Sequence, residues 1–128
     1  EIEKDALLNA IRCSIENKKG LVAFNTGDVL PDEGNICEHF IIKRTLIDSL
    51  QDKQIFSTDF WHLGSDNYLW AQARFIGEAI RCDEAKVKHY HFSQGGVVDD
   101  VYKKGWSHAT QDREVLNKKL WKYKHHLQ

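Results

Sequence analysis

Features that commonly fix a protein's location are scarce in this sequence. Its three cysteines, Cys13, Cys37 and Cys82, are odd in number and form no CxxC pair, which argues against a disulfide framework and for a reducing, cytoplasmic compartment. No apolar run approaches the roughly 20 residues that cross a bilayer, so we expect no membrane span. The acidic start, Glu1-Ile2-Glu3, also lacks the basic flank of a signal peptide.

Charge of one sign is not in excess. Eighteen lysines and arginines oppose 19 acidic residues, which weakens the case for a nucleic-acid or anionic-membrane partner. The last quarter is the exception, because after residue 102 only Asp112 and Glu114 oppose a series of lysines and arginines. This asymmetry indicates the solvated face of the last helix or, as a functional alternative, a patch for diphosphate or another anionic ligand.

Methionine is absent, even from the first position, and a helical pattern begins almost at once. We therefore expect the chain to be a piece of a longer protein. Its 128 residues, 41% of them apolar, are sufficient for a single domain with its own core. No internal repeat or low-complexity tract interrupts it.

Hydrophobic periodicity predicts a mixed α/β chain, α+β in character as a fragment, with a small mixed sheet packed by helices. A helix over residues 3–18 places Leu7, Ala10, Ile11, Ser14 and Ile15 on one face and ends near Gly20. The first half continues with a strand at 21–25, a loop at 26–35, a strand at 36–44 and a short helix at 45–50.

An irregular aromatic stretch at 55–61 leads to a second clear helix. Ser65 or Asp66 is expected to cap this helix and Gly77 to end it, and Trp70 lies on its apolar face in the core. The second half continues with strands at 79–82 and 86–92, a short helix near 98–103, and a helix from about 111 with Leu116, Leu120, Tyr123 and Leu127 on its packing face.

The pair His89-Tyr-His91 is the first candidate site. Alternate residues of a strand share one face, so the two imidazoles lie about 7 Å apart and can share or neighbour a cation. The spacing alone favours two ordinary histidines at a strand end, one bonded in the core and one solvated.

Asp66 is the second candidate, although aspartate is also among the preferred helix caps. The two roles are compatible, because helix amides and the helix dipole favour the ionised carboxylate that a base requires. A third hypothesis is a zinc site made of Cys37, His39, His89 and His91, against which Cys37 is more simply a buried small residue.

In order and length, about sixty residues resemble the later half of family 2 glycosyltransferases and their GT-A relatives. The correspondence runs from a strand that ends at Arg44, through the aromatic stretch and the helix 66–77, to a last strand that ends in histidine. In that family an aspartate lies eleven residues before the helix-ending glycine, as Asp66 does before Gly77. The metal-binding histidine follows a Glu-Ala pair by four residues, as His89 follows Glu84-Ala85.

The resemblance implies that the chain is the C-terminal, acceptor-side half of a GT-A domain. It implies an inverting transfer of a sugar from a nucleotide-sugar donor to an acceptor hydroxyl, with Asp66 as the base. His89, or His91 as second choice, would complete a site for Mn²⁺ or Mg²⁺ whose DxD carboxylates are not in this chain. The chain departs from the family at Ser65, which replaces a glutamate, and alone it is expected to be inactive.

The acceptor sugar is expected to bind at the start of the predicted helix. The candidate substrate-binding residues there are Phe60, Trp61, His62 and Asn67. Two other readings stay open. One is a non-enzymatic α+β binding or interaction domain. The other is a metal-dependent nuclease that uses the histidines with Asn67 or Asp66.

Overall fold

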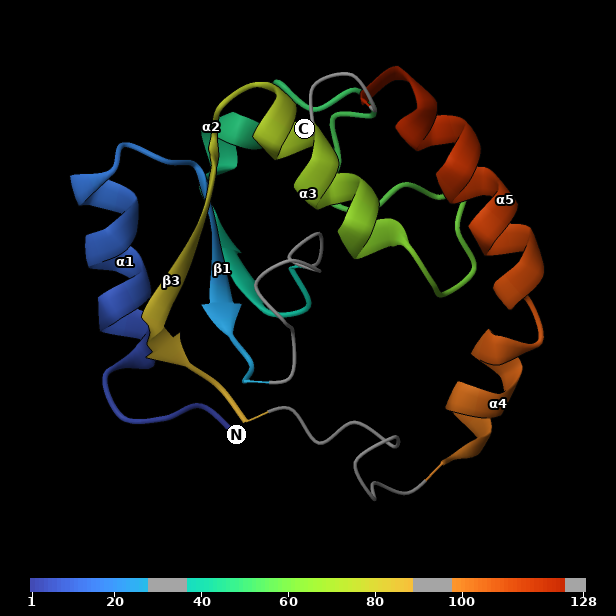
Figure 1. The fold of residues 1–128 in the computed structure, drawn as a ribbon, viewed down its shortest axis with the longest axis horizontal. Helices are drawn as coiled ribbons and strands as arrows, with labels where there is room; N and C mark the ends of the chain where they lie inside the picture. The colour runs from blue at the N-terminus through green and yellow to red at the C-terminus, as the bar shows by residue number, and fades with distance from the viewer. Residues whose placement is uncertain (28–36, 89–97, 124–128) are drawn as a thin grey trace.

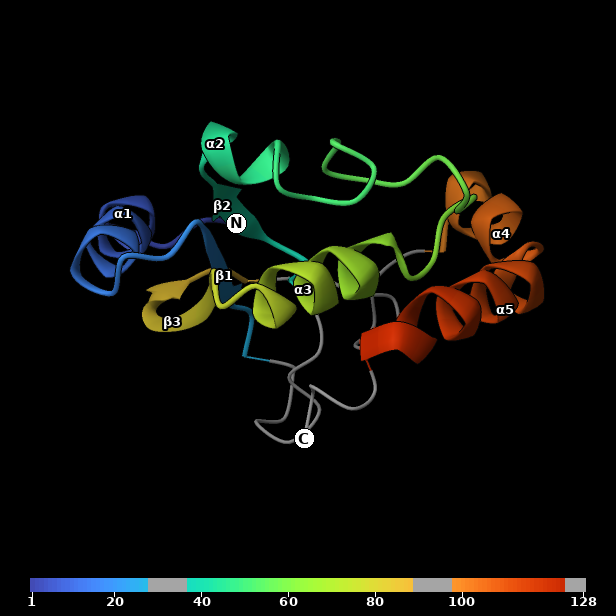
Figure 2. The ribbon, with the colours of Figure 1, turned by 90° about the horizontal axis from the view of Figure 1, so that it is seen from above.

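The structure is a computed structural model that describes residues 1–27, 37–88 and 98–123. In these ranges a small three-stranded sheet is packed by helices, as the sequence predicts for an α+β chain. The helices α1 and α5 lie at opposite ends of the long axis, with the sheet and α3 between them (Figures 1 and 2). No helix in the described ranges is both long and apolar enough to cross a membrane.

The sheet has the strand order β2-β1-β3. The central strand β1 (Leu21–Asn25) lies antiparallel to β2 (Phe40–Ile42) and parallel to β3 (Ala79–Lys86). Because neighbouring side chains of a strand point to opposite faces, the apolar run of β1 is buried on both sides. Leu21 and Ala23 pack toward α3, whereas Val22 and Phe24 share a cluster with Ala10 of α1.

The helix α3 (Ser65–Phe75) is buried on two sides and therefore connects the sheet to the C-terminal part. Leu69, Trp70 and Ala73 belong to the cluster on the sheet, which confirms Trp70 as a core residue. Tyr68 and Ala71 instead share a cluster with residues that precede and follow the helix: Phe60, Leu116, Leu120 and Tyr123. Full burial of a side chain such as Leu69 stabilises the fold by about 2 kcal/mol.

The C-terminal part consists of α4 (Asp100–Trp106), α5 (Ala109–Leu120) and the 3-10 turn η3 (Trp121–Tyr123). Leu116, Leu120 and Tyr123 form the packing face as predicted, and Leu127 lies outside the described residues. Helix α4 starts about two residues later than predicted, because Asp99 caps it by accepting the Tyr102 N–H at 2.8 Å. Helix α5 starts about two residues earlier than predicted.

Several predicted boundaries are wrong. The helix predicted at 3–18 is α1 (Ala6–Glu16), and Lys18 rather than Gly20 takes the left-handed φ after it. The small residues Ala6, Ala10 and Ser14 face the sheet, so the larger side chains of the predicted face are exposed: Leu7, Ile11 and Ile15.

The strands also differ from the prediction. The buried strand expected at 36–44 is only the three-residue β2, because Lys43 already precedes the short helix α2 (Arg44–Ile47). The segments expected to form two strands, at 79–82 and 86–92, instead begin as the single strand β3. Its pairing with β1 shifts register between Phe24 and Asn25, and there the Asn25 side chain donates to the Asp83 carbonyl at 3.2 Å. The loop expected at 26–35 lies mostly outside the described residues.

Candidate functional site

A cavity of about 520 Å³ lies beside the start of α3 and reaches α4 and α5. Aromatic side chains line part of its wall: Phe56, Tyr102 and Trp106. Polar residues line the rest, among them Glu38, Asp66, Asn67, Asp112 and Arg113. A cavity of this size with apolar walls and a few converging polar groups is typical of small-molecule sites.

Asp66 is the second residue of α3 and lies inside its first turn. The helix cap is Gly64, whose φ of 89° suits glycine, so the prediction that Ser65 or Asp66 caps the helix is wrong. Burial raises the pKa of the Asp66 carboxyl above its ordinary value, although the backbone amides of Asn67 and Asp66 and the charge of His62 act to lower it. Desolvation thus outweighs the helix effects that we expected to dominate.

His62 connects this segment to α4. Its ring meets the Tyr102 ring edge-on at 5.7 Å between centroids. Gly105 provides the room, because a Cβ atom on that residue would lie 2.6 Å from the His62 ring. The imidazole therefore packs directly on the α4 backbone, within electrostatic reach of Asp66.

Asp112 holds the chain segment that precedes Asp66. Its side chain is fully buried, and its carboxylate accepts the backbone N–H groups of Trp61, His62 and Leu63 at 2.8, 2.8 and 2.7 Å. Burial alone would raise the pKa of Asp112, but these N–H donors and the charge of His108 outweigh it, so the pKa is lowered. The first turn of α5 thereby fixes the entry to α3.

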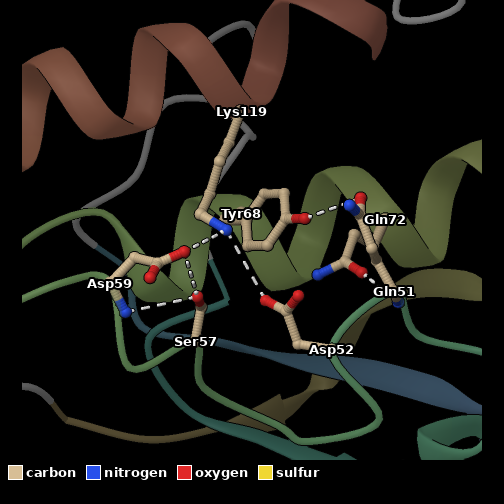
Figure 3. A network of polar contacts seen from close by, with 7 residues as sticks. All are labelled: Gln51, Asp52, Ser57, Asp59, Tyr68, Gln72 and Lys119. Carbon is tan, nitrogen blue, oxygen red and sulfur yellow. Dashed lines mark hydrogen bonds and ion pairs between the residues drawn. The ribbon is translucent and has the colours of Figure 1, made fainter.

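A second contact from α5 holds the preceding loop (Figure 3). The Lys119 ammonium lies 2.7 Å from Asp59, 3.6 Å from Asp52, and 4.7 Å from the centre of the Tyr68 ring. The hydrogen bond and charge of Lys119 lower the pKa of Asp59. Because this loop also carries Phe56, Lys119 helps to place one aromatic wall of the cavity.

The structure gathers three of the predicted site residues, Asp66, His62 and Asn67, at the cavity. Phe60 and Trp61 do not line it. Phe60 packs near Tyr68 between α3 and α5. Trp61 is 62% exposed and stacks on His108, with ring centroids 4.2 Å apart.

His89 and His91 lie outside the described residues, so the predicted metal ligand is not placed. Within the ranges that the structure describes, no three His, Cys, Asp or Glu side chains gather to hold a metal ion. Cys37 is buried, and its thiol donates to the Asp66 carbonyl at 3.4 Å. Burial raises the pKa of Cys37, which opposes the thiolate that zinc requires.

No protein-family model, curated protein or solved structure matches this chain.

Sequence reasoning missed several cavity residues: Glu38, Phe56, Tyr102, Trp106, Asp112 and Arg113. Phe56 belongs to the aromatic stretch and Arg113 to the basic last quarter, but the convergence of all six residues depends on how α4 and α5 pack. Asp112 lies in the first turn of α5, a position that predicts bonds to the amides of its own helix rather than to those of a distant segment.

Proposed function

We propose that this chain is the acceptor-side part of a GT-A-type glycosyltransferase in which Asp66 deprotonates the acceptor hydroxyl. The observation that supports this most is the position of Asp66, a partly buried carboxylate that lines a cavity whose wall also contains aromatic rings. The resemblance of the sequence to family 2 enzymes points to the same residue.

The proposed role requires a carboxylate that accepts a proton efficiently. A general base acts best when its pKa lies near the working pH, and burial moves the pKa of Asp66 in that direction. The acceptor oxygen would form a bond to the anomeric carbon while its proton passes to Asp66. The nucleoside diphosphate would leave from the opposite face of the sugar, so the anomeric configuration inverts.

The acceptor sugar would lie against the aromatic wall. Phe56 and Trp106 are 50% and 44% exposed, so each presents a ring face or edge to a ligand without unfolding. Asn67 and Arg113 line the same cavity and supply donors for sugar hydroxyls. In this proposal Phe56, Tyr102 and Trp106 replace Phe60 and Trp61 as the stacking residues.

The resemblance also implies Mn²⁺ or Mg²⁺ at the leaving group. Its carboxylate ligands would come from sequence not in this chain, and His89 is not among the described residues. In this proposal the base and the acceptor pocket belong to this cavity, and the donor and metal sites would belong to residues outside this chain. We place the protein in a reducing, cytoplasmic compartment, since Cys13, Cys37 and Cys82 are all free thiols.

Acceptor binding is testable on the 128-residue chain. Mono- and oligosaccharides are titrated into the ¹⁵N-labelled protein and followed by NMR. We expect saturable shifts around Asn67 and Trp106, lost in Trp106→Ala. Trp121→Ala is the matched control, because Trp121 is 69% exposed and does not line the cavity. Equal loss in both variants, or shifts remote from the cavity, would remove the acceptor assignment.

A further inference from the structure

A second concave surface, of about 500 Å³, is lined by α5, η3, the first half of α3 and the loop that precedes α3. We call it the lysine groove. Three lysines from α5 and η3 line it, Lys118, Lys119 and Lys122, facing Gln51, Asp59 and Tyr68. The basic C-terminal quarter thus directs several of its charges into one recess, which an ordinary solvated helix face does not require.

The charges in the lysine groove are unbalanced. Lys119 is engaged by Asp52 and Asp59. Lys118 and Lys122 have no carboxylate within ion-pair distance in the part of the chain that the structure describes. Lys122 lies over the Tyr123 ring at 4.8 Å, a contact that does not neutralise its ammonium charge. The three lysines and the two aspartates together carry a net charge of +1, and Lys118 and Lys122 are the lysines available to an anion.

Gln51 contributes an uncharged hydrogen-bond donor to the lysine groove. The Gln51 side-chain oxygen accepts from the Tyr68 hydroxyl at 3.1 Å, and the Gln51 backbone N–H donates to Gln72 at 2.8 Å (Figure 3). The Gln51 amide N–H₂ makes no hydrogen bond within the described residues. The Tyr68 hydrogen bond fixes the orientation of the Gln51 amide. Because Gln51 lines the groove together with the lysines, its N–H₂ group can donate to a bound ligand.

We propose that the lysine groove binds the dianionic phosphate of a small phosphomonoester. Lys118 and Lys122 would pair with its two negative charges, and the Gln51 amide would donate to a third oxygen. Asp59 is already paired with Lys119, so the uncharged part of the ligand would lie beside Asp59 and the Tyr68 ring. This site is separate from the Asp66 cavity and does not depend on the glycosyltransferase proposal.

The test titrates glycerol 2-phosphate into the ¹⁵N-labelled 128-residue chain at low salt. We expect saturable shifts at Gln51, Lys118 and Lys122, and an affinity at least about tenfold lower in Lys118→Gln/Lys122→Gln. Lys86→Gln/Lys104→Gln makes the same change in net charge at exposed lysines outside the groove and should bind like wild type. An equal loss in both double variants would show general charge attraction and overturn the site.

Two further experiments test whether the phosphate group is what binds and whether it belongs to a small molecule or to a lipid. Glycerol without phosphate should cause no shift in the groove, and equal shifts with glycerol would overturn the proposal. Vesicles of phosphatidylcholine with phosphatidic acid present the same group on a lipid. Binding to these vesicles without binding to glycerol 2-phosphate would replace the proposed small-molecule site with a membrane surface site.

Discussion

The carboxylate of Asp112 accepts the backbone N–H of Leu63 at 2.7 Å, across 49 residues of sequence. Its bonds to the N–H groups of Trp61 and His62 complete a set of three. A buried carboxylate is costly unless it is fully bonded, and three backbone donors meet that requirement. The chain segment that leads to Asp66 is therefore held in place by the first turn of α5.

Asp112→Asn should destabilise the fold. The asparagine oxygen still accepts, but the charge is lost and an amide N–H₂ faces backbone donors. We expect a loss of about 2 kcal/mol in the free energy of unfolding, measured with urea at pH 7. Glu114→Gln, on the exposed side of the same helix, should change it by less than about 0.5 kcal/mol. Similar losses in the two variants would show that the Asp112 bonds contribute little.

The same bonds predict an acid dependence. The pKa of Asp112 is lowered from its ordinary 3.8, so the carboxylate's contribution to stability is fully present above the unfolded-state pKa and is lost as pH falls through the lowered value. The difference in stability between wild type and Asp112→Asn should therefore shrink below about pH 4. Urea midpoints at pH 7, 4, 3 and 2 measure it, and a constant difference would contradict the assignment.

Asp66→Asn should behave in the opposite way. Because burial raises the pKa of Asp66, protonation favours the fold, and that contribution is present below the unfolded-state pKa and lost as pH rises through the raised value. The asparagine variant cannot ionise, so it should gain stability relative to wild type between pH 3 and pH 7. Thermal unfolding across this range is the measurement. A variant that becomes relatively less stable as pH rises would indicate that Asp66 is a stabilising anion.

Gly105→Ala tests the contact between α4 and His62. The new Cβ atom would lie 2.6 Å from the imidazole, so the ring must move. We expect the overpacking to lower the free energy of unfolding by about 1–3 kcal/mol, and the better helix propensity of alanine to offset part of this loss. NMR should show the His62 ring resonances displaced. Lys104→Ala, exposed on the same helix, should leave them in place, and unchanged His62 resonances in Gly105→Ala would contradict the packing.

Local chemistry explains which elements the sequence could predict. The strand 21–25 is correct because a short apolar run ends at turn residues, and the end of α3 is correct because Gly77 takes a φ of 75°. Strand β2 is shorter than predicted because only three residues of its apolar run pair with β1. The number of residues that pair depends on the partner strand, and the hydrophobic periodicity of one segment carries no information about that partner.

The candidate site, like the fold, could be predicted only in part. Asp66, His62 and Asn67 were predictable, because residues around one helix start share one neighbourhood. Trp61 and Phe60 belong to the same stretch, yet the ring of one turns to His108 and that of the other to Tyr68. Side-chain direction in an irregular segment depends on its hydrogen bonds, and here Asp112 supplies them from a distant helix.

The most direct test of the central proposal is sugar transfer by the complete gene product that contains this chain. A panel of nucleotide-sugars and acceptors is assayed by mass spectrometry, with Asp66→Asn beside Asp83→Asn, an exposed aspartate of β3. We predict transfer by wild type and Asp83→Asn, and turnover about 10²- to 10⁴-fold lower in Asp66→Asn with acceptor binding intact. Turnover at the wild-type rate in Asp66→Asn would contradict the role of Asp66 as the base.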